Sequence, residues 1–291
     1  MILEGDDVRL SYFVSGEGTP VTLLHGFTQN GRSWLETISR MPQGWMWIVP
    51  DLRGHGKTRT QPGAVCTMEA CTRDLEMLWD HLGMTRTHLA GYSMGGRLAL
   101  HVAARRPQRI LSLLTIGAHA GLEEEARAGR RLGDDALAHR IENDGFEEFI
   151  NYWSGLPLFA GLERRGPSFV AQVRAERMNN RVAGLAESLR GMGAGAMRPV
   201  WDELAGVRCP CTFVAGQLDH GYVASARRLA GSVPNGRVVI VQRAGHAVHM
   251  EPMAATERRL VHEYLRDRHE VETYSEGEEP RRHLVVAPIV S

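Results

Sequence analysis

A serine set between glycines constrains this chain more than any other segment. Residues 90–97 read Ala-Gly-Tyr-Ser-Met-Gly-Gly-Arg, with an apolar run over Thr87–Tyr92 and an amphipathic helical pattern over Arg97–Arg105. A Gly-x-Ser-x-Gly turn between a strand and a helix is typical of a nucleophile elbow, in which small residues permit a turn tight enough to expose the serine at the sheet edge. We therefore expect Ser93 to be an activated serine and not part of an ordinary glycine-rich turn.

An activated serine needs a base, and the base needs an acid that orients it. The strand pattern that begins at Cys211 leads to Asp219, and the one that begins at Arg237 leads to His246. Each of these residues follows a strand, and the chain order Ser93, Asp219, His246 is that of the catalytic triad in the α/β-hydrolase fold. The sequence therefore predicts this fold and this triad.

Other residues compete for the acid and base positions. Asp219 is also suited to capping the helix that follows it, whereas Asp202 and Glu203 come too early to follow the correct strand. His249 competes with His246. We favour His246 because the Ala-Gly turn before it lets the imidazole swing back over the sheet, while His249 lies deeper in the next segment.

Two backbone amides are predicted to stabilise an oxyanion. Val21–Phe27 is an apolar run that ends in His-Gly-Phe, the position from which this fold supplies one amide, here that of Phe27. The second amide belongs to the residue after the nucleophile, Met94.

Nucleotide, metal and cofactor sites are not predicted. Gly56-Lys57-Thr58 looks like the end of a phosphate-binding loop, but that motif requires a glycine where Asp51 stands. The cysteines show no zinc-type spacing; they are Cys66, Cys71, Cys209 and Cys211.

The length suits one large α/β domain with an insertion. We expect residues 1–121 and 201–267 to form the core, a mostly parallel central sheet flanked by helices. Residues 122–200 show helical patterns without a strand and are predicted to be a cap inserted after the sixth strand. Residues 268–291 combine an acidic run with an apolar end and are predicted to be a C-terminal extension outside the active site.

The balance of charge limits the partners. With 34 basic and 34 acidic residues, nothing favours a nucleic-acid or anionic-membrane partner. No apolar run approaches the length of a membrane span. The cysteine usage and the absence of a signal-like N-terminus favour a reducing cytoplasm. The sequence leaves open whether the chain is a monomer or a homo-oligomer.

Several segments together resemble one family, the 2-succinyl-6-hydroxy-2,4-cyclohexadiene-1-carboxylate synthases of menaquinone biosynthesis. The resemblance covers roughly residues 10–265. The segments that carry it are Arg97 four residues after Ser93, Gly121-Leu122 with the run Arg127–Arg130, Trp153 with Leu156-Pro157-Leu158-Phe159, and Arg177-Met178-Asn179-Asn180. The loop after Asp219 departs from the family, because it reads His-Gly-Tyr where the family more often has a Lys-Phe pair.

The resemblance implies a lyase that releases pyruvate from 2-succinyl-5-enolpyruvyl-6-hydroxy-3-cyclohexene-1-carboxylate by a base-initiated 2,5-elimination. It implies that Ser93 abstracts the proton with help from His246 and Asp219, without an acyl-enzyme. A small polycarboxylate suits guanidinium groups, which bind carboxylates bidentately. The residues expected to contact it are Arg97, Arg130, Arg177 and Trp153, with Tyr92 and His25 added because they adjoin the nucleophile and the oxyanion loop.

Two other functions stay open. A hydrolase that acts on a carbon–carbon bond or a carboxylic ester would use the same triad and amides, because the fold hosts many reactions. A non-catalytic ligand receptor on this fold is less favoured, since the triad is intact. Convergence of the arginines favours the lyase over a hydrolase of neutral esters. Lys57 is the only lysine, however, so an arginine is also the default cation of this chain.

Overall fold

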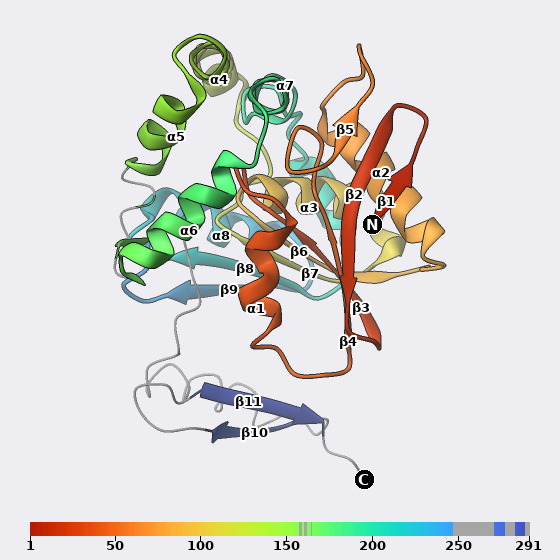
Figure 1. The fold of residues 1–291 in the computed structure, drawn as a ribbon. Coiled ribbons are helices and arrows are strands. Elements are labelled where there is room, and N and C mark those ends of the chain that lie inside the picture. Colours follow the sequence, from red (N-terminus) through yellow and green to blue (C-terminus); the bar gives the residue numbers. More distant parts are fainter. Residues whose placement is uncertain (157–158, 160–161, 164, 247–270, 277–282, 289–291) are drawn as a thin grey trace.

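A computed structural model describes residues 1–156, 159, 162–163, 165–246, 271–276 and 283–288. Its centre is a nine-stranded sheet with the order β1-β2-β4-β3-β6-β7-β8-β9, and β5 pairs with β2 (Figure 1). The strands are β1 Ile2–Glu4, β2 Val8–Ser15, β3 Thr19–Leu24, β4 Trp45–Pro50, β5 Arg59–Thr60, β6 Thr87–Tyr92, β7 Ile110–Ile116, β8 Cys211–Gly216 and β9 Gly236–Val241. All pairs from β4 to β9 are parallel, whereas β2 runs antiparallel to its neighbours.

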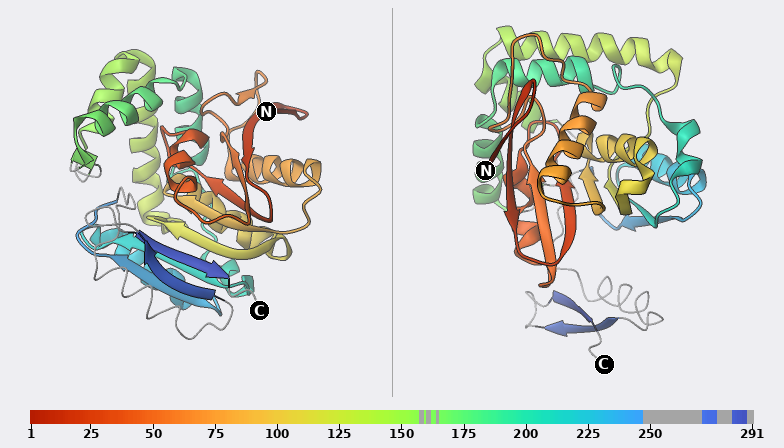
Figure 2. Two further views of the ribbon diagram at one scale, coloured as in Figure 1. Left: turned by 60° about the horizontal axis from the view of Figure 1, so that its bottom comes forward. Right: turned by 90° about the vertical axis from the view of Figure 1, so that its right-hand side faces the viewer.

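Helices cover both faces of the sheet, and the layers are seen from two sides in Figure 2. The core helices are α1 Leu35–Ile38, α2 Met68–His81, α3 Met94–Arg105 and α8 His220–Ser232, with short 3-10 turns at Gly31–Trp34, Pro107–Arg109 and Trp201–Gly206. The larger apolar cluster joins α2, α3 and α8 to one face of the sheet. A smaller cluster joins α1 and the turn before it to the other face. This is the α/β-hydrolase architecture that the triad order predicts.

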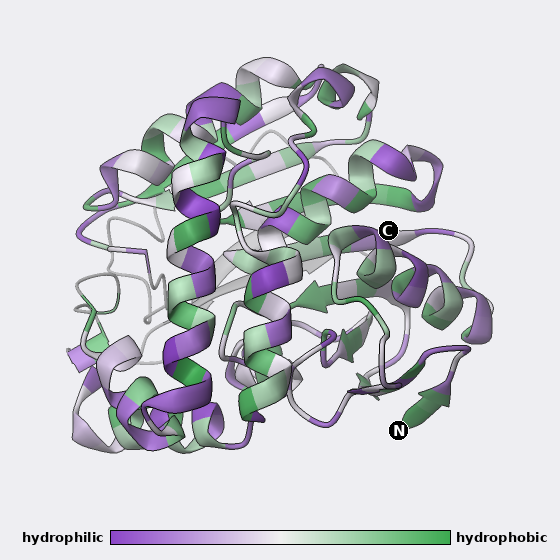
Figure 3. Ribbon diagram, turned by 90° about the horizontal axis from the view of Figure 1, so that it is seen from above, coloured by the Kyte–Doolittle hydropathy of each residue, from purple (hydrophilic) through white to green (hydrophobic). Residues whose placement is uncertain are grey.

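Four helices stand between β7 and β8 and gather at one end of the molecule (Figure 1). They are α4 Glu124–Asn143, α5 Phe146–Ser154, α6 Pro167–Met178 and α7 Val182–Met192. Apolar and polar residues alternate along these helices (Figure 3), because one side of each packs into a separate apolar cluster. We call these helices the cap. The cap follows the seventh strand in chain order, because the two-residue β5 is included in the count.

Element boundaries follow the sequence patterns with small differences. β6 covers Thr87–Tyr92 as predicted. α3 begins at Met94 and not at Arg97, because the chain turns into the helix directly after Ser93. β3 ends at Leu24, so the His-Gly-Phe segment lies outside the strand.

The C-terminal extension contains two strands, β10 Val271–Glu276 and β11 His283–Pro288, which pair antiparallel in a sheet of their own. Residues 247–270, 277–282 and 289–291 lie outside the described residues, as do Pro157, Leu158 and His249. Within the part of the chain that the structure describes, no helix is long and apolar enough to cross a membrane.

Backbone of α3 packs directly against the sheet. A Cβ atom placed on Gly95 would lie 2.3 Å from the carbonyl oxygen of Leu24, and one on Gly91 would lie 2.2 Å from that of Gly95. Real Cβ atoms do not approach backbone so closely, so these positions accept only glycine.

We therefore expect Gly95→Ala to lower the free energy of unfolding by at least about 2 kcal/mol, because the new methyl group forces α3 away from β3. Gly129→Ala is the matched control, since a Cβ on Gly129 in α4 meets nothing within 4 Å. It should be neutral or stabilising by up to about 1 kcal/mol. Urea titrations of both variants measure this, and equal stability of the two would contradict the packing argument.

Candidate active site

The three predicted triad side chains meet at the carboxyl ends of neighbouring strands. His246 Nε2 lies 3.0 Å from Ser93 Oγ, and His246 Nδ1 lies 2.8 Å from Asp219 Oδ2. Ser93 follows β6, Asp219 follows β8 and His246 follows β9. These contacts join residues 153 and 27 positions apart, so only the fold brings them together. The arrangement allows a proton to pass from the hydroxyl to the imidazole while the carboxylate fixes the ring.

Ser93 has a strained backbone. Its φ of 52° and ψ of −111° lie outside the regions that residues with a Cβ prefer, and it is one of three non-glycine residues with positive φ among those described. The Ser93 amide donates to the carbonyl of Ile116 in β7 at 2.8 Å, and the Ser93 carbonyl accepts from the Arg97 amide at 3.0 Å. These two bonds hold the strained turn against the sheet and the helix.

Asp219 and the ring of His246 are held from several sides. Asp219 precedes α8 but makes no capping hydrogen bond with its side chain, because the carboxylate is turned to His246. Gly117 lies against the imidazole, and a Cβ there would come within 2.8 Å of its Cε1 atom. His246 is 3% exposed. The ring is therefore nearly closed to water.

Two backbone amides are free where an oxyanion hole is predicted. Neither the Phe27 nor the Met94 N–H has a hydrogen-bond acceptor within the described part of the chain. The loop that carries Phe27 is fixed by its neighbours: Thr28 has a positive φ of 66°, and the Gly26 amide donates to the Gln29 side chain at 2.8 Å. Both amides are thus available to a ligand.

Asn180, at the end of α6, ties the cap to this loop. Its Nδ2 donates to the carbonyl of Thr28 at 2.7 Å and to that of Arg177 at 3.0 Å, while its Oδ1 accepts from the Gly56 amide at 2.9 Å. The residue is buried. The sequence indicated Asn180 only through the family resemblance, and its contacts identify it as the link between cap and core.

His25, which the sequence suggested as a pocket residue, is fully buried and bonded within the protein. It has no exposed surface; its Nε2 accepts from the Leu52 amide at 2.9 Å, so its Nδ1 donates to the Gly26 carbonyl at 2.9 Å. Burial lowers the pKa of His25 to about 4. With both nitrogens used, the ring joins the loop after β3 to the loop after β4.

Arg97 is a cation without an anion. Its Nη1 donates to the carbonyl of Met192 at 2.8 Å and lies 3.9 Å from Met197 Sδ. Among the described residues it forms no ion pair with a carboxylate. Burial lowers the pKa of Arg97, and the charge of Arg130 acts in the same direction. The Arg97 side chain is partly buried, and an unpaired guanidinium in such a place is unfavourable unless a ligand neutralises it.

Arg177 is a second such cation. It is 3% exposed, donates from Nη1 to Ser154 Oγ at 2.6 Å and lies 4.3 Å over the ring of Phe159. Its Nε is buried without an acceptor, and burial lowers its pKa to about 10. The side chain also lines a cavity of about 110 Å³.

Trp153 packs among rings. Its ring lies 5.2 Å from that of Phe27, 5.6 Å from that of Phe159 and 6.1 Å from that of Phe149, and its Nε1 is buried without an acceptor. The structure therefore places it beside the oxyanion loop. Arg130 differs, because it is half-exposed and its Nε donates to Asp134 Oδ1 at 2.7 Å. Arg130 is thus already paired within α4.

Sequence reasoning missed two residues next to the triad, Tyr222 and His119. The ring of Tyr222, in α8, lies 4.4 Å from that of His246, and the ring of the expected Tyr92 lies 5.6 Å from it. His119 lies 6.1 Å from Tyr222. Tyr222 could have been found as a departure from the family pattern, whereas nothing in the sequence singled out His119.

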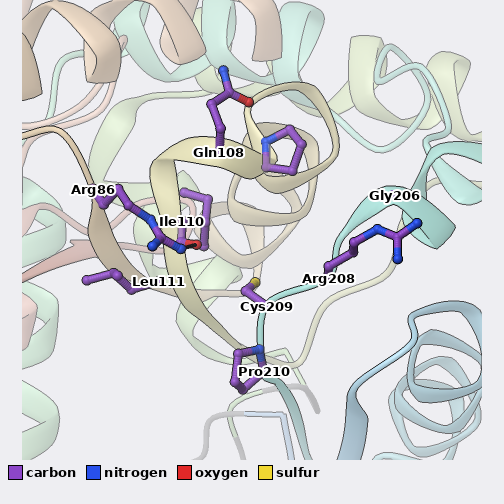
Figure 4. Close-up of a pocket in the computed structure, with 9 residues that line it drawn as sticks. Arg86, Gln108, Ile110, Leu111, Gly206, Arg208, Cys209 and Pro210 are labelled. Carbon is purple, nitrogen blue, oxygen red and sulfur yellow. Dashed lines mark hydrogen bonds between the residues drawn. The ribbon is translucent and has the colours of Figure 1, made fainter.

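A further cavity, of about 510 Å³, lies at the amino ends of β6, β7 and β8. Its lining includes Arg86 before β6, Ile110 at the start of β7 and Cys209 before β8 (Figure 4). The triad follows strands of the same sheet at their carboxyl ends, so this cavity is separate from it. Within the described ranges, no group of three or more His, Cys, Asp or Glu residues could hold a metal ion.

Comparisons with known proteins agree with the fold. A family described as the alpha/beta hydrolase fold matches residues 19–252. A Bacillus subtilis (strain 168) protein, provisionally named 2-succinyl-6-hydroxy-2,4-cyclohexadiene-1-carboxylate synthase, is 34% identical over 86% of this chain and 92% of its own. A Salmonella newport (strain SL254) protein with that name is 28% identical over 80% of this chain and 89% of its own.

Solved structures give the same result. MenH from S. aureus superposes with a TM-score of 0.79 at 29% identity, over 88% of this chain and 98% of that one. A thermophilic esterase from Thermogutta terrifontis superposes with a TM-score of 0.70 at 28% identity, over 89% of this chain and 93% of that one.

A second family, described as the R-3-H domain, matches residues 238–288. The match includes both strands of the C-terminal extension and overlaps the hydrolase match over residues 238–252. The sequence patterns predicted an extension over residues 268–291 but did not relate it to any family.

Acid should destabilise the protein through its buried imidazoles. Burial lowers the pKa of His25 to about 4 and those of His55 and His119 to about 3, against about 6.5 in the unfolded chain. Both states are neutral above pH 6.5, but below it only the unfolded state takes up protons. The free energy of unfolding should therefore fall by roughly 2 kcal/mol per histidine between pH 6.5 and 5. Urea titrations across this range measure the fall. His55→Gln should remove about a third of what these three histidines contribute, and a flat profile would contradict the prediction.

Removal of the Asn180 side chain should loosen the cap. We expect Asn180→Ala to lower the free energy of unfolding by about 1–3 kcal/mol, because the Thr28 carbonyl and the Gly56 amide lose their partner, whereas the Arg177 carbonyl keeps the backbone amide of residue 180. Asn143→Ala, in which an exposed asparagine bonded only within α4 is replaced, should change it by less than about 0.5 kcal/mol. Thermal and urea unfolding compare the two, and similar effects would show that Asn180 is not the link.

Proposed function

This chain belongs to the alpha/beta hydrolase fold family and, within it, to the 2-succinyl-6-hydroxy-2,4-cyclohexadiene-1-carboxylate synthases, and from that premise we propose that it is a pyruvate-releasing lyase. Its substrate would be 2-succinyl-5-enolpyruvyl-6-hydroxy-3-cyclohexene-1-carboxylate. The product would be 2-succinyl-6-hydroxy-2,4-cyclohexadiene-1-carboxylate, an intermediate of menaquinone biosynthesis.

The observation that carries this proposal is a pair of guanidinium groups, those of the partly buried Arg97 and the buried Arg177, that have no carboxylate partner among the described residues. Tyr92 and Tyr222 both contact His246; Arg177 interacts electrostatically with Tyr92, and Arg97 does so with Tyr222. Each cation therefore acts on a ring that contacts the imidazole. Two positive charges near the triad suit a substrate with more than one carboxylate.

Comparison with another buried arginine supports this interpretation. Arg53 is 2% exposed and is neutralised within the chain, by Asp74 at 2.6 Å and by Asp7 at 2.6 Å. Arg97 and Arg177 have no such partners among the described residues. The protein thus supplies carboxylates where a buried arginine is structural, and we infer that the substrate supplies them at the site.

The triad would act as a proton relay. Ser93 Oγ takes the proton from the substrate carbon next to the carbonyl as its own proton passes to His246 Nε2, and Asp219 stabilises the imidazolium through Nδ1. The electron pair of the broken C–H bond moves through the ring and expels the enolpyruvyl group with cleavage of its C–O bond. The proton on His246 then returns to the leaving group, which gives pyruvate. No covalent intermediate forms.

The free amides of Phe27 and Met94 would stabilise the developing enolate oxygen. Hydrogen-bond donors that are fixed before the reaction need no rearrangement as charge develops, and losing one costs about 3 kcal/mol in comparable sites. Trp153 would close the pocket against the ring of the substrate, since it packs on Phe27.

A hydrolase is the alternative function. The likeness to the Thermogutta terrifontis esterase favours it, because the same triad and amides would serve acyl transfer. A decisive comparison gives one enzyme sample the enolpyruvyl precursor and a neutral short-chain p-nitrophenyl ester. We expect pyruvate release with a kcat/KM at least a hundredfold higher than that of ester cleavage. Faster ester cleavage without pyruvate release would refute the lyase.

Replacement of Arg97 tests the role of the cations. Arg97→Lys keeps the charge but loses the bidentate fork, so kcat/KM for pyruvate release should fall at least about thirtyfold, equivalent to about 2 kcal/mol, with the melting temperature near that of the wild type. Arg131→Lys, on the exposed side of α4, is the matched control and should leave both unchanged. An unaltered kcat/KM in Arg97→Lys would remove the side chain from substrate binding.

A further inference from the structure

Tyr222 occupies a position in the site that neither the triad nor the oxyanion amides explain. Its ring covers the imidazole of His246 at 4.4 Å between centroids, with 44° between the planes. Its hydroxyl has no hydrogen-bond partner among the described residues. Burial raises the pKa of Tyr222, and the nearby charge of Arg97 opposes the shift, so the hydroxyl stays protonated and can donate.

His119 supplies a second neutral donor. The Gly121 amide donates to His119 Nδ1 at 3.1 Å, so the ring proton of the neutral imidazole is on Nε2. Burial, and then the charges of Arg97 and Arg130, lower the pKa of His119 to about 3. The ring is therefore uncharged at neutral pH. Its Nε2 has no partner among the described residues.

Both donors lie near Arg97. The rings of His119 and Tyr222 lie 6.1 Å apart, and the guanidinium of Arg97 is close enough to shift the pKa of both. The two neighbouring carboxylates are already engaged, Asp219 by His246 and Asp134 by Arg130 and the Gly195 amide. Arg97 and its two neighbours thus offer one positive charge and two neutral donors, and both neighbouring carboxylates already have partners.

We propose that the Tyr222 hydroxyl and the His119 Nε2–H are positioning groups that, together with Arg97, bind one carboxylate of the substrate and the oxygen atom next to it. The guanidinium fork suits the two carboxylate oxygens, and a further donor suits the neighbouring ether or keto oxygen. An enolpyruvyl group carries this arrangement of oxygens, and so does pyruvate. The kinetic part of this inference rests on the proposed function, whereas the binding part does not.

Four variants distinguish the loss of a hydrogen-bond donor from the loss of side-chain packing. Tyr222→Phe keeps the ring over His246 and removes only the hydroxyl. His119→Asn places an amide oxygen where Nδ1 accepts from Gly121 but has no donor at the Nε2 position, whereas His119→Gln can place an NH₂ group near that position. Tyr152→Phe, on the exposed side of α5, is the control.

The probe is pyruvate, with its Kd measured by isothermal titration at pH 7.5, alongside kcat and KM for the enolpyruvyl precursor. We expect Tyr222→Phe and His119→Asn each to raise the Kd and KM about tenfold or more, with kcat changed less than about threefold. His119→Gln should retain more affinity than His119→Asn, and Tyr152→Phe should match the wild type.

Other outcomes overturn the inference. A wild-type Kd for pyruvate in both Tyr222→Phe and His119→Asn would show that neither side chain binds the carboxylate, as would a wild type that does not bind pyruvate. A fall in kcat at unchanged KM and Kd would show that the residues act through His246 instead. Should the wild type bind pyruvate but release none from the precursor, the proposed function fails, and the Kd values alone decide the subsite.

Discussion

The close contact between α3 and the sheet is the constraint on which the site depends. Gly91, Gly95 and the strand end at Leu24 leave no room for a side chain, so the helix begins within one residue of the strand. Ser93 is forced into a positive φ by this geometry and is held there by the Ile116 carbonyl. The serine hydroxyl, one oxyanion amide and Arg97 are all placed by that single turn, because they lie at the first turn of the helix.

The arginines differ in whether the protein itself neutralises their charge. Arg53 is buried with two carboxylates, whereas the partly buried Arg97 contacts a carbonyl and the buried Arg177 contacts a hydroxyl and an aromatic ring. An unneutralised cation costs free energy in the unliganded fold, and binding of an anion recovers it. The site is therefore matched to an anion before it meets one. Asn180 holds the cap against the core, since it connects the helix of Arg177 to the loop that carries Phe27.

Sequence patterns predicted the fold and the approximate places of the elements because they report local chemistry. The elbow glycines, the strand before Ser93 and the late acid and histidine are each readable within a few residues. Long-range partners are not readable in this way. Nothing adjacent to His25 shows that its ring bonds the Leu52 amide. The pairing of Arg130 with Asp134 is different, because the two residues are four apart in one helix and their spacing alone indicates the contact. His119 lies near the triad only because the loop after β7 packs against α8, where its ring meets that of Tyr222. The resemblance to one family also left the C-terminal extension unassigned, although that segment matches a different one.

The central claim is that Ser93 abstracts the proton that starts the elimination. Removing its hydroxyl tests this most directly, because Ser93→Ala leaves the glycine packing and both arginines in place. The account predicts that pyruvate release from the enolpyruvyl precursor falls at least about a thousandfold, while the circular dichroism spectrum and the urea midpoint stay those of the wild type. Near-normal pyruvate release by a folded Ser93→Ala protein would contradict it and leave the elbow as architecture alone.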